Sequence, residues 1–580
     1  MRKPILLSVL FAVSGCGVDA RDPTVGDDGK GPVDPMSSAA IIINPSALEA
    51  HVVGDHAVTS DFTATLVTPD GRQEDVTHEV TFSLADARFG SFTGTQLTVT
   101  GQGAGETRVV ATLGAQSGST PVSVYVTGTR TDENLAFAPA LFANAKPAHG
   151  CEPAIAYPDN HTLVPANLGT LDVHWNDSIN DLYRVHVTNH YVDLTYYAKG
   201  KALEIAEDWS KFETSHSRMT IEVTGIDSAA PSVKCTAEPR IIDVTHEAAR
   251  GAVYFWSTDW LARAQGLSGQ DIMRFDLAKP NVAPTPMFTD ANRPATCVGC
   301  HALSRDGARI AMTMGGGAGV GSVIDLPTNR QLMPSGANAP RWSTAVFNHD
   351  GQKLIAVQDG QMRLITATGG ETLATIDNTP GMIAGNPELS PDGTKLVNVE
   401  STGADDWAFG NASIVTRSFD NRTNTFGTIQ MLIPFDATAG VQSYYPSWSP
   451  DGQWLAITRS PNGNSYANID ATIWVVKADG SVPAIELGTT KGLTDSWARW
   501  MPSKNTLDDE TVYFLTFSST RPFGTRIPDG GLAQIWVTPF FPSRAMAGAD
   551  ATGPAHRAPF QSMFASNHNA QWTTSVVSSK

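Results

Sequence analysis

The sequence predicts an all-β protein in which two N-terminal β-sandwiches precede a six-bladed β-propeller. Three observations lead to this assignment. Gly 51 and Pro 36 make turns dense, only 17% of the residues are charged against a usual ~25%, and one turn motif recurs through the C-terminal half. A chain of 580 residues also exceeds a single core, since domains average roughly 100–200 residues. The units are therefore assigned in order from the N-terminus.

The first 15 residues have the pattern of a cleaved export signal. Two basic residues precede the apolar stretch 5–13, and small residues separate that stretch from Cys16. The run 13–16 resembles the bacterial lipobox, whose cysteine is diacylated and becomes the new N-terminus. The resemblance implies a lipid-anchored protein of the bacterial cell envelope, and the glycine after Cys16 favours the outer membrane under the enterobacterial sorting rule. The alternative is an ordinary secretory peptide with an incidental cysteine.

The net charge excludes one class of partner and constrains another. Lys+Arg 40 and Asp+Glu 58 give a formal charge of −18, whereas a nucleic-acid partner requires a basic face. No nucleic acid is therefore expected as a partner. Anionic lipid would also repel the chain, so the lipid on Cys16 must itself supply the membrane attachment, each buried CH₂ contributing roughly 0.8 kcal/mol.

A tether and a first sandwich follow the signal. Residues 16–38 are polar and rich in Gly and Pro without periodicity, which is typical of a disordered segment. From 39 to 128 short alternating runs such as Val122–Val126 are separated by turn residues, as expected for strands of a small sandwich. Gly103–Thr107 leading into Val109–Ala111 resembles a bacterial immunoglobulin-like domain, and the resemblance implies a spacer or adhesive unit.

Residues 131–246 predict a second sandwich. Runs such as Leu182–Val187 alternate as half-buried strands do, and the unit resembles a fibronectin type III domain. Five cysteines in an exported chain would leave one thiol unpaired. Their spacing accounts for all five as one lipid cysteine, one close pair and the distant pair Cys151 and Cys235. We expect the distant pair to form a disulfide, which would contribute about 3–5 kcal/mol under the chain-entropy model.

Residues 247–576 contain the repeated motif. Each copy has an apolar residue, a turn that ends in Asp-Gly and then an apolar strand, because Asp caps its own loop and Gly accepts positive φ. The spacing is roughly that of a four-stranded propeller blade, with one longer interval. These residues are therefore structural. The copies begin at Leu303, Phe347, Leu389 and Trp448.

Two degenerate inner strands, Ala498–Trp500 and Ala570–Trp572, bring the number of blades to six. This half of the chain resembles a TolB-like propeller. Gly251–Trp256 and Asp271–Phe275 supply outer strands of a first blade that has no inner strand before it. We therefore expect the strand around Trp572 to complete that blade, which removes the open edge of the ring.

One motif carries chemistry. Cys297, Cys300 and His301 form C-x-x-C-H, the spacing for covalent c-type haem, in which two thiols add to the haem vinyl groups and the imidazole ligates iron. Export supports this reading, because c-type haem is attached outside the bacterial cytoplasm. Cys297–Gly307 also resembles haem-bearing TolB-like propellers. The alternative is a C-x-x-C disulfide in which His301 has no role. A zinc site is less favoured, because the sequence shows no fourth ligand for it.

The position of the motif in the repeat suggests where a haem would sit. His301 falls at the start of an inner strand, so the haem is expected at the mouth of the central channel. Methionines on a second strand are more often core residues than ligands. His568 enters the closing inner strand from the same end as His301, and we favour it as the second axial ligand. The full set of candidates is Met312, Met314, His349 and His568.

No catalytic residue is predicted. The glycine-rich run 315–321 fits neither a dinucleotide loop nor a Walker A motif, and the chain has no G-x-S-x-G. The sequence predicts an exported, lipid-anchored propeller with one haem c, acting in electron transfer or redox sensing with a protein or redox partner at the envelope. The alternative, implied by the TolB-like resemblance, is a non-enzymatic binding or assembly scaffold with a structural haem or only a C-x-x-C disulfide.

Overall fold

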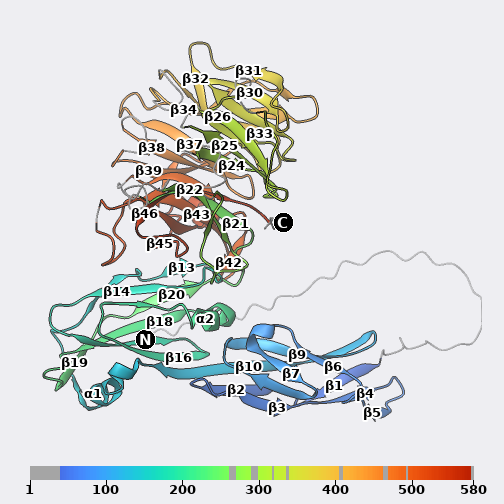
Figure 1. Cartoon of the computed structure of the whole chain (residues 1–580), viewed down its shortest axis with the longest axis vertical. Helices are drawn as coiled ribbons and strands as arrows, with labels where there is room; N and C mark the ends of the chain where they lie inside the picture. Colours follow the sequence, from blue (N-terminus) through green and yellow to red (C-terminus); the bar gives the residue numbers. More distant parts are fainter. Residues whose placement is uncertain are drawn as a thin grey trace, which may run out of the picture.

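The structure is a computed structural model that describes residues 39–259, 269–288, 298–315, 319–334, 339–403, 409–461, 468–490, 494–528 and 530–575. The predicted export signal, Cys16, the tether and Cys297 lie outside these residues. Two N-terminal β units lie side by side, and the propeller stands on the second of them (Figure 1). Within the described chain, none of the helices is long and apolar enough to span a membrane.

The all-β prediction is confirmed. The described helices are short and lie between strands: η1 (Ala87–Phe89), η2 (Glu133–Leu135), α1 (Ala138–Asn144), α2 (Trp209–Ser215) and α4 (Pro542–Met546).

Alternating side chains build the first unit. The residues of β1 and β9 are alternately buried and exposed, because successive side chains of a strand point to opposite faces. Two three-stranded sheets, β1-β4-β5 and β3-β8-β7, face a larger sheet that includes β2, β6 and β9. The strands are β1 (Ala40–Asn44), β2 (Leu48–Val53), β3 (Val58–Asp61), β4 (Thr63–Val67), β5 (Gln73–Asp75), β6 (Thr81–Leu84), β7 (Gly90–Thr93), β8 (Gln96–Val99) and β9 (Gly105–Leu113).

One long strand joins the two N-terminal units. β10 (Gln116–Arg130) pairs antiparallel with β9 and parallel with β2, and its last residues pair with β16 of the second unit, as in Val126 with Val192. Buried residues of both units also belong to one hydrophobic core. The predicted boundary at 128–131 therefore falls at the end of a strand that both units share, and the two units have one continuous sheet.

The second unit continues that sheet. Cys151 and Cys235 form a disulfide with their Cα atoms 5.5 Å apart. A buried carboxylate, Asp208, is held by Lys211 at 2.8 Å and Arg130 at 3.1 Å. The strands are β11 (Lys146–Pro147), β12 (Ala154–Tyr157), β13 (Thr162–Val164), β14 (Asp172–Asn176), β15 (Leu182–Thr188), β16 (Val192–Ala198), β17 (Ala202–Glu204), β18 (Met219–Ile226), β19 (Val233–Thr236) and β20 (Arg240–Val244).

Six four- or five-stranded sheets of the described residues make up the propeller, and each is one blade. From blade one to blade six, the inner strands are β46, β24, β28, β32, β37 and β41. Blade one is β46 (Ala565–Trp572), β21 (Ala252–Asp259), β22 (Gln270–Asp276) and β23 (Thr285–Pro286), and blade two is β24 (Val298–Leu303), β25 (Arg309–Met314), β26 (Val320–Asp325) and β27 (Arg330–Gln331). Blade three is β28 (Thr344–Phe347), β29 (Lys353–Gln358), β30 (Gln361–Thr366) and β31 (Thr372–Ile376).

The remaining blades have the same antiparallel order. Blade four is β32 (Ile383–Leu389), β33 (Lys395–Ser401), β34 (Ser413–Asp420), β35 (Thr425–Phe426) and β36 (Gln430–Ile433), and blade five is β37 (Gln442–Trp448), β38 (Trp454–Ser460), β39 (Thr472–Lys477) and β40 (Ile485–Glu486). Blade six is β41 (Ser496–Trp500), β42 (Asn505–Leu507), β43 (Glu510–Ser519), β44 (Gln534–Phe540) and β45 (His556–Arg557).

The repeated Asp-Gly turn has the same hydrogen bonds in its four copies. The side chain that follows the apolar residue accepts the backbone N–H five residues later, as in Trp454 N to Ser449 Oγ at 2.9 Å and Lys353 N to Asn348 Oδ1 at 2.8 Å. The glycine of each turn has φ between 67 and 71°, a conformation that other residues rarely adopt. The equivalent acceptors are Ser304, Asn348, Ser390 and Ser449.

The C-terminal strand closes the ring, as predicted. β46 pairs antiparallel with β21, and Val253 lies opposite Trp572. Beyond the strand, Thr574 N donates to Arg305 O at 3.2 Å and Ser575 Oγ donates to Asp306 O at 2.6 Å. The last described residues thus bind the turn of blade two as well as the sheet of blade one, and β21 has a strand on both sides.

The second unit is docked against blades one and six. Arg557 N donates to Tyr157 Oη at 3.1 Å, and Arg526 pairs with Asp172 at 3.0 Å. Asn167 Nδ2 donates to Ala249 O at 2.8 Å at the entry to the propeller. These contacts orient the propeller relative to the N-terminal units.

Candidate functional site

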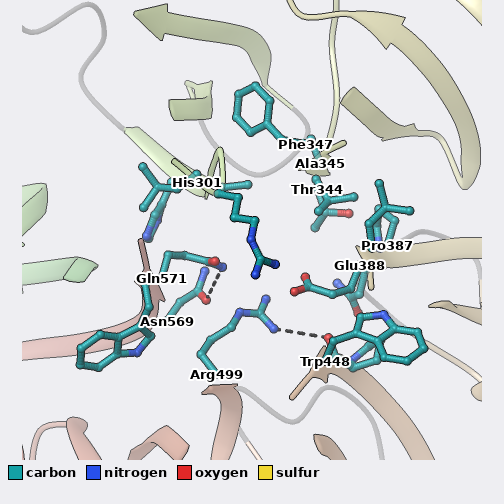
Figure 2. Close-up of a pocket in the computed structure, with 18 of the residues that line it drawn as sticks. His301, Thr344, Ala345, Phe347, Pro387, Glu388, Trp448, Arg499, Asn569 and Gln571 are labelled. Atoms are coloured by element: carbon teal, nitrogen blue, oxygen red, sulfur yellow. Dashed lines mark hydrogen bonds between the residues drawn. The ribbon is translucent and has the colours of Figure 1, made fainter. Parts of the chain in front are cut away.

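The central channel of the propeller holds a cavity of about 770 Å³. All six inner strands contribute to its wall, and so do the first residues of the turns that follow them. Figure 2 shows polar side chains from several blades pointing into it, among them Glu388 and Arg499. The volume is within the range of about 300–1,000 Å³ that organic ligands occupy in proteins.

Five inner strands share one irregularity. Each has a break in its ladder with the second strand and a residue of positive φ at the equivalent place. Non-glycine residues are uncommon there, and such conformations cluster at ligand sites. A bulge also redirects side chains toward a new face, which here is the channel. The residues are Cys300 (φ 43°), Asn386 (44°), Tyr445 (52°), Trp497 (54°) and Asn569 (52°), and β28 has a regular ladder instead.

The second half of the C-x-x-C-H motif is the blade-two copy of this bulge. Cys300 is the residue of positive φ, and His301 occupies the place held by Pro387 and Pro446 in blades four and five. Both residues of the motif line the cavity. His301 lies on an inner strand as predicted, but it is the fourth residue of β24 rather than at the start of the strand.

His301 is buried, with 3% of its surface exposed. Nε2 lies 3.3 Å from the carbonyl oxygen of Tyr254 on β21, and Nδ1 is buried with no hydrogen-bond partner among the described residues. Burial lowers the pKa of His301 to about 4, and the positive charge of Arg499 lowers it further while the Tyr254 carbonyl opposes the shift. The imidazole is therefore neutral near pH 7, which is the form that ligates metal.

The structure does not bring His568 to the cavity wall. His568 lies on β46 opposite Trp256, and its ring centroid is 5.7 Å from that of Trp256 and 6.0 Å from that of Trp497. Both tryptophans line the cavity, whereas His568 does not, and its Nε2 is 2.8 Å from Ser566 Oγ. Burial lowers its pKa to about 4.

The other candidate ligands are dispersed. Met312 is buried in the core between blades one and two, and Met314 pairs with Val298 at the far end of β25. Neither lines the cavity. His349 does line it, from the turn end of the channel, where its Nδ1 lies 2.9 Å from Pro391 O. Among the described residues, no group of three or more His, Cys, Asp or Glu side chains is arranged to hold a metal ion.

The sequence analysis did not identify the polar residues of other blades that line the cavity. Arg499 on β41 and Glu388 on β32 both line the cavity. Burial raises the pKa of Glu388, and the positive charge of Arg499 opposes that rise. An alignment of the inner strands could have identified these residues from the sequence. When the strands are aligned on the apolar residue that precedes the turn, one position is occupied by Ala302, Glu388, Ser447, Arg499 and Gln571.

Comparison with known proteins identifies no family. No family model matches the chain, and no curated protein matches it. Among solved structures, TolB from Acinetobacter baumannii is 10% identical, covering 61% of this chain and 79% of its own with a TM-score of 0.37. Putative TolB from Agrobacterium tumefaciens is 14% identical, covering 57% and 95% with a TM-score of 0.28. The dihydro-heme d1 dehydrogenase NirN in complex with DHE is 12% identical, covering 50% and 51% with a TM-score of 0.31.

Proposed function

We propose that this chain is an exported, lipid-anchored β-propeller of the bacterial cell envelope that carries one covalent c-type haem and acts in electron transfer or redox sensing. One observation carries the proposal. Cys300 and His301 lie together on the wall of a cavity of about 770 Å³, and His301 Nδ1 is buried there without a hydrogen-bond partner among the described residues.

The residues of the motif fit a haem chemically. The sulfur of Cys300, and that of Cys297 outside the described residues, would each add across a haem vinyl group. One C–S bond forms and the thiol hydrogen goes to the other vinyl carbon, so no oxidant is needed. The bound group would supply one-electron chemistry.

One contact of His301 supports its proposed role as an iron ligand. Metal-bound histidines usually donate their other ring N–H to a carbonyl or carboxylate, which fixes tautomer and ring plane. The Nε2 to Tyr254 O distance of 3.3 Å fits such a contact and would leave Nδ1 unprotonated. In this assignment Nδ1 is the nitrogen that binds iron, and β21 of blade one holds the ring.

The rest of the chain would position this site. We assign the two N-terminal units as immunoglobulin-like and fibronectin type III-like spacers, with the tether and the lipid on Cys16 placing them at the outer membrane. Their shared strand β10 and the docking contacts of Asn167 and Arg526 support a stiff stalk. A protein or redox partner would then meet the propeller at a set distance from the membrane.

A second candidate function is a ligand-binding scaffold in which Cys297 and Cys300 form a disulfide. The position of His568 favours it, because this predicted second ligand does not line the cavity. The polar atoms of blades three to six would then serve a ligand other than haem.

A visible absorption spectrum of the full chain from its native host separates the two. Haem c predicts a Soret band with a reducible α-band, and a haem-stained band on a denaturing gel, since thioethers survive denaturation. A folded, colourless protein from a host with active haem maturation would overturn the haem assignment and leave the scaffold.

A further inference from the structure

Several buried polar atoms without hydrogen-bond partners belong to side chains of blades three to six that line the cavity. They are Thr344 Oγ1, Asn386 Oδ1, Trp448 Nε1 and Arg499 Nε, none of which has a hydrogen-bond partner among the described residues, and all four side chains line the cavity. Buried polar groups are bonded in the great majority of cases. Trp448 Nε1 and Arg499 Nε can only donate, whereas Thr344 Oγ1 can donate or accept, so donors outnumber acceptors among these four atoms.

Arg499 is the strongest of these donors. Its Nη1 makes only long contacts, 3.4 Å to Pro446 O and 3.4 Å to Ala498 O, and within the described ranges no carboxylate forms an ion pair with it. A guanidinium with its Nε buried and unpaired is costly. Its planar fork matches a carboxylate, which accepts two parallel N–H donors.

The wall also has an apolar component. Trp448, Trp500, Trp572 and Phe347 occupy equivalent places on four inner strands and all line the cavity. Aromatic side chains of this size offer flat surfaces to a planar ligand. Donors and aromatic faces together suit a flat molecule that has an acidic end.

Glu388 restricts the choice of ligand. It points into the cavity near Arg499 (Figure 2), and burial raises its pKa. When ionised it would repel a second carboxylate, and when protonated it would offer a donor. The ligand carboxylate therefore belongs at Arg499, where an ionised Glu388 would weaken its binding.

We propose that Arg499 forms a carboxylate-binding site for a flat organic molecule in the propeller channel. Two sources have this chemistry. A haem propionate is one, and that source depends on the function proposed above. A free aromatic carboxylate is the other, and it needs only the cavity and its wall.

The first experiment uses full-length protein made without haem maturation, in buffer free of carboxylates, with benzoate as the probe and benzamide as its neutral analogue. Tryptophan fluorescence and calorimetry report binding, and circular dichroism reports folding. We expect benzoate to bind and benzamide to bind more weakly. Arg499→Gln should weaken benzoate binding about tenfold or more, and Glu388→Gln should strengthen it.

Arg422→Gln is the matched control, because Arg422 is exposed and its contact with Asp420 is 3.9 Å long. It should leave benzoate affinity unchanged. Equal binding of benzoate and benzamide, or equal benzoate binding by wild type and Arg499→Gln, would overturn the free-ligand form of the site.

The second experiment uses haem-loaded protein and distinguishes the sources. If the carboxylate is a propionate, loaded protein no longer binds benzoate, and Arg499→Gln keeps the haem-stained band while its midpoint potential shifts relative to Arg422→Gln. If the ligand is free, loaded and haem-free protein bind benzoate alike and the potential is unchanged. If the protein is colourless and binds benzoate through Arg499, the haem assignment is wrong and the carboxylate site stands. If the protein does not bind benzoate and the midpoint potential is unchanged, the carboxylate site is wrong.

Discussion

Tyr254 and His301 are 47 residues apart in sequence, yet the carbonyl oxygen of the first lies 3.3 Å from Nε2 of the second. Tyr254 is on β21 of blade one and His301 is on β24 of blade two. The neighbouring blade therefore holds the one histidine of the C-x-x-C-H motif in a defined orientation. An isolated peptide with the same motif would not have this contact.

We expect Cys16→Ser to release the protein from the membrane fraction or block its processing. The acidic chain has no other attachment in this proposal, and an anionic surface repels it. Fractionation with and without detergent checks this. Unchanged, detergent-dependent membrane association of the variant would contradict lipid anchoring at this residue.

Replacing Cys297 and Cys300 together by alanine should abolish covalent haem. The thioether bonds would be lost, so a merely ligated cofactor would be stripped by denaturant. Haem staining after denaturing electrophoresis measures the outcome, and Cys151→Ala with Cys235→Ala is the control that removes the other two described cysteines. A stained band that persists in the Cys297 and Cys300 variant rejects thioether attachment.

The spin state of ferric haem tests the second ligand. The sequence predicts His568, but its ring lies against Trp256 and Trp497 rather than on the cavity wall. From this geometry we expect a wild type with an open axial position that is high spin and binds carbon monoxide readily, and His568→Ala should leave the spectrum unaltered. A low-spin spectrum with two nitrogen ligands that turns high spin in His568→Ala would restore the sequence prediction.

Ser449→Ala should lower the stability of the propeller by about 1–2 kcal/mol. The fully buried Ser449 Oγ donates to Asp451 Oδ1 at 2.5 Å and accepts from Trp454 N at 2.9 Å, and alanine removes the acceptor of the buried Trp454 N–H. Thermal unfolding followed by calorimetry measures the change. Ser481→Ala removes a similar contact to Asp479 at an exposed turn and should have a much smaller effect, so equal losses in the two variants would contradict the structural role of the repeat.

Acidification should destabilise the propeller between about pH 6.5 and 4. Burial lowers the pKa of His301 and His568 to about 4 and that of His556 to about 3, from 6.5. In this window the unfolded chain binds more protons, so stability falls as pH falls, by about 2 kcal/mol per histidine between pH 7 and 5. Denaturant unfolding at several pH values checks the slope, which His556→Gln should reduce. A variant with an unreduced slope would show that His556 does not contribute.

Local sequence patterns were sufficient to predict the parts of this protein that repeat. The all-β class, the Asp-Gly turns and the closing strand near Trp572 follow from alternating apolar residues and from Gly at positive φ, which act within a few residues of chain. The pairing of Cys151 with Cys235, expected from cysteine spacing and the predicted export signal, is present in the structure.

Tertiary structure decided the rest. β10 extends past Gly128 and joins two units that the sequence separates, because strand pairing depends on which edge is free. Alignment places Cys300, Asn386 and Asn569 at one position, but only the folded ring turns their bulges toward a common channel. Contacts between blades determine whether His568 faces His301 and whether Arg499 has a carboxylate partner. Such contacts depend on side chains far apart in sequence, and the local pattern of neither strand encodes them.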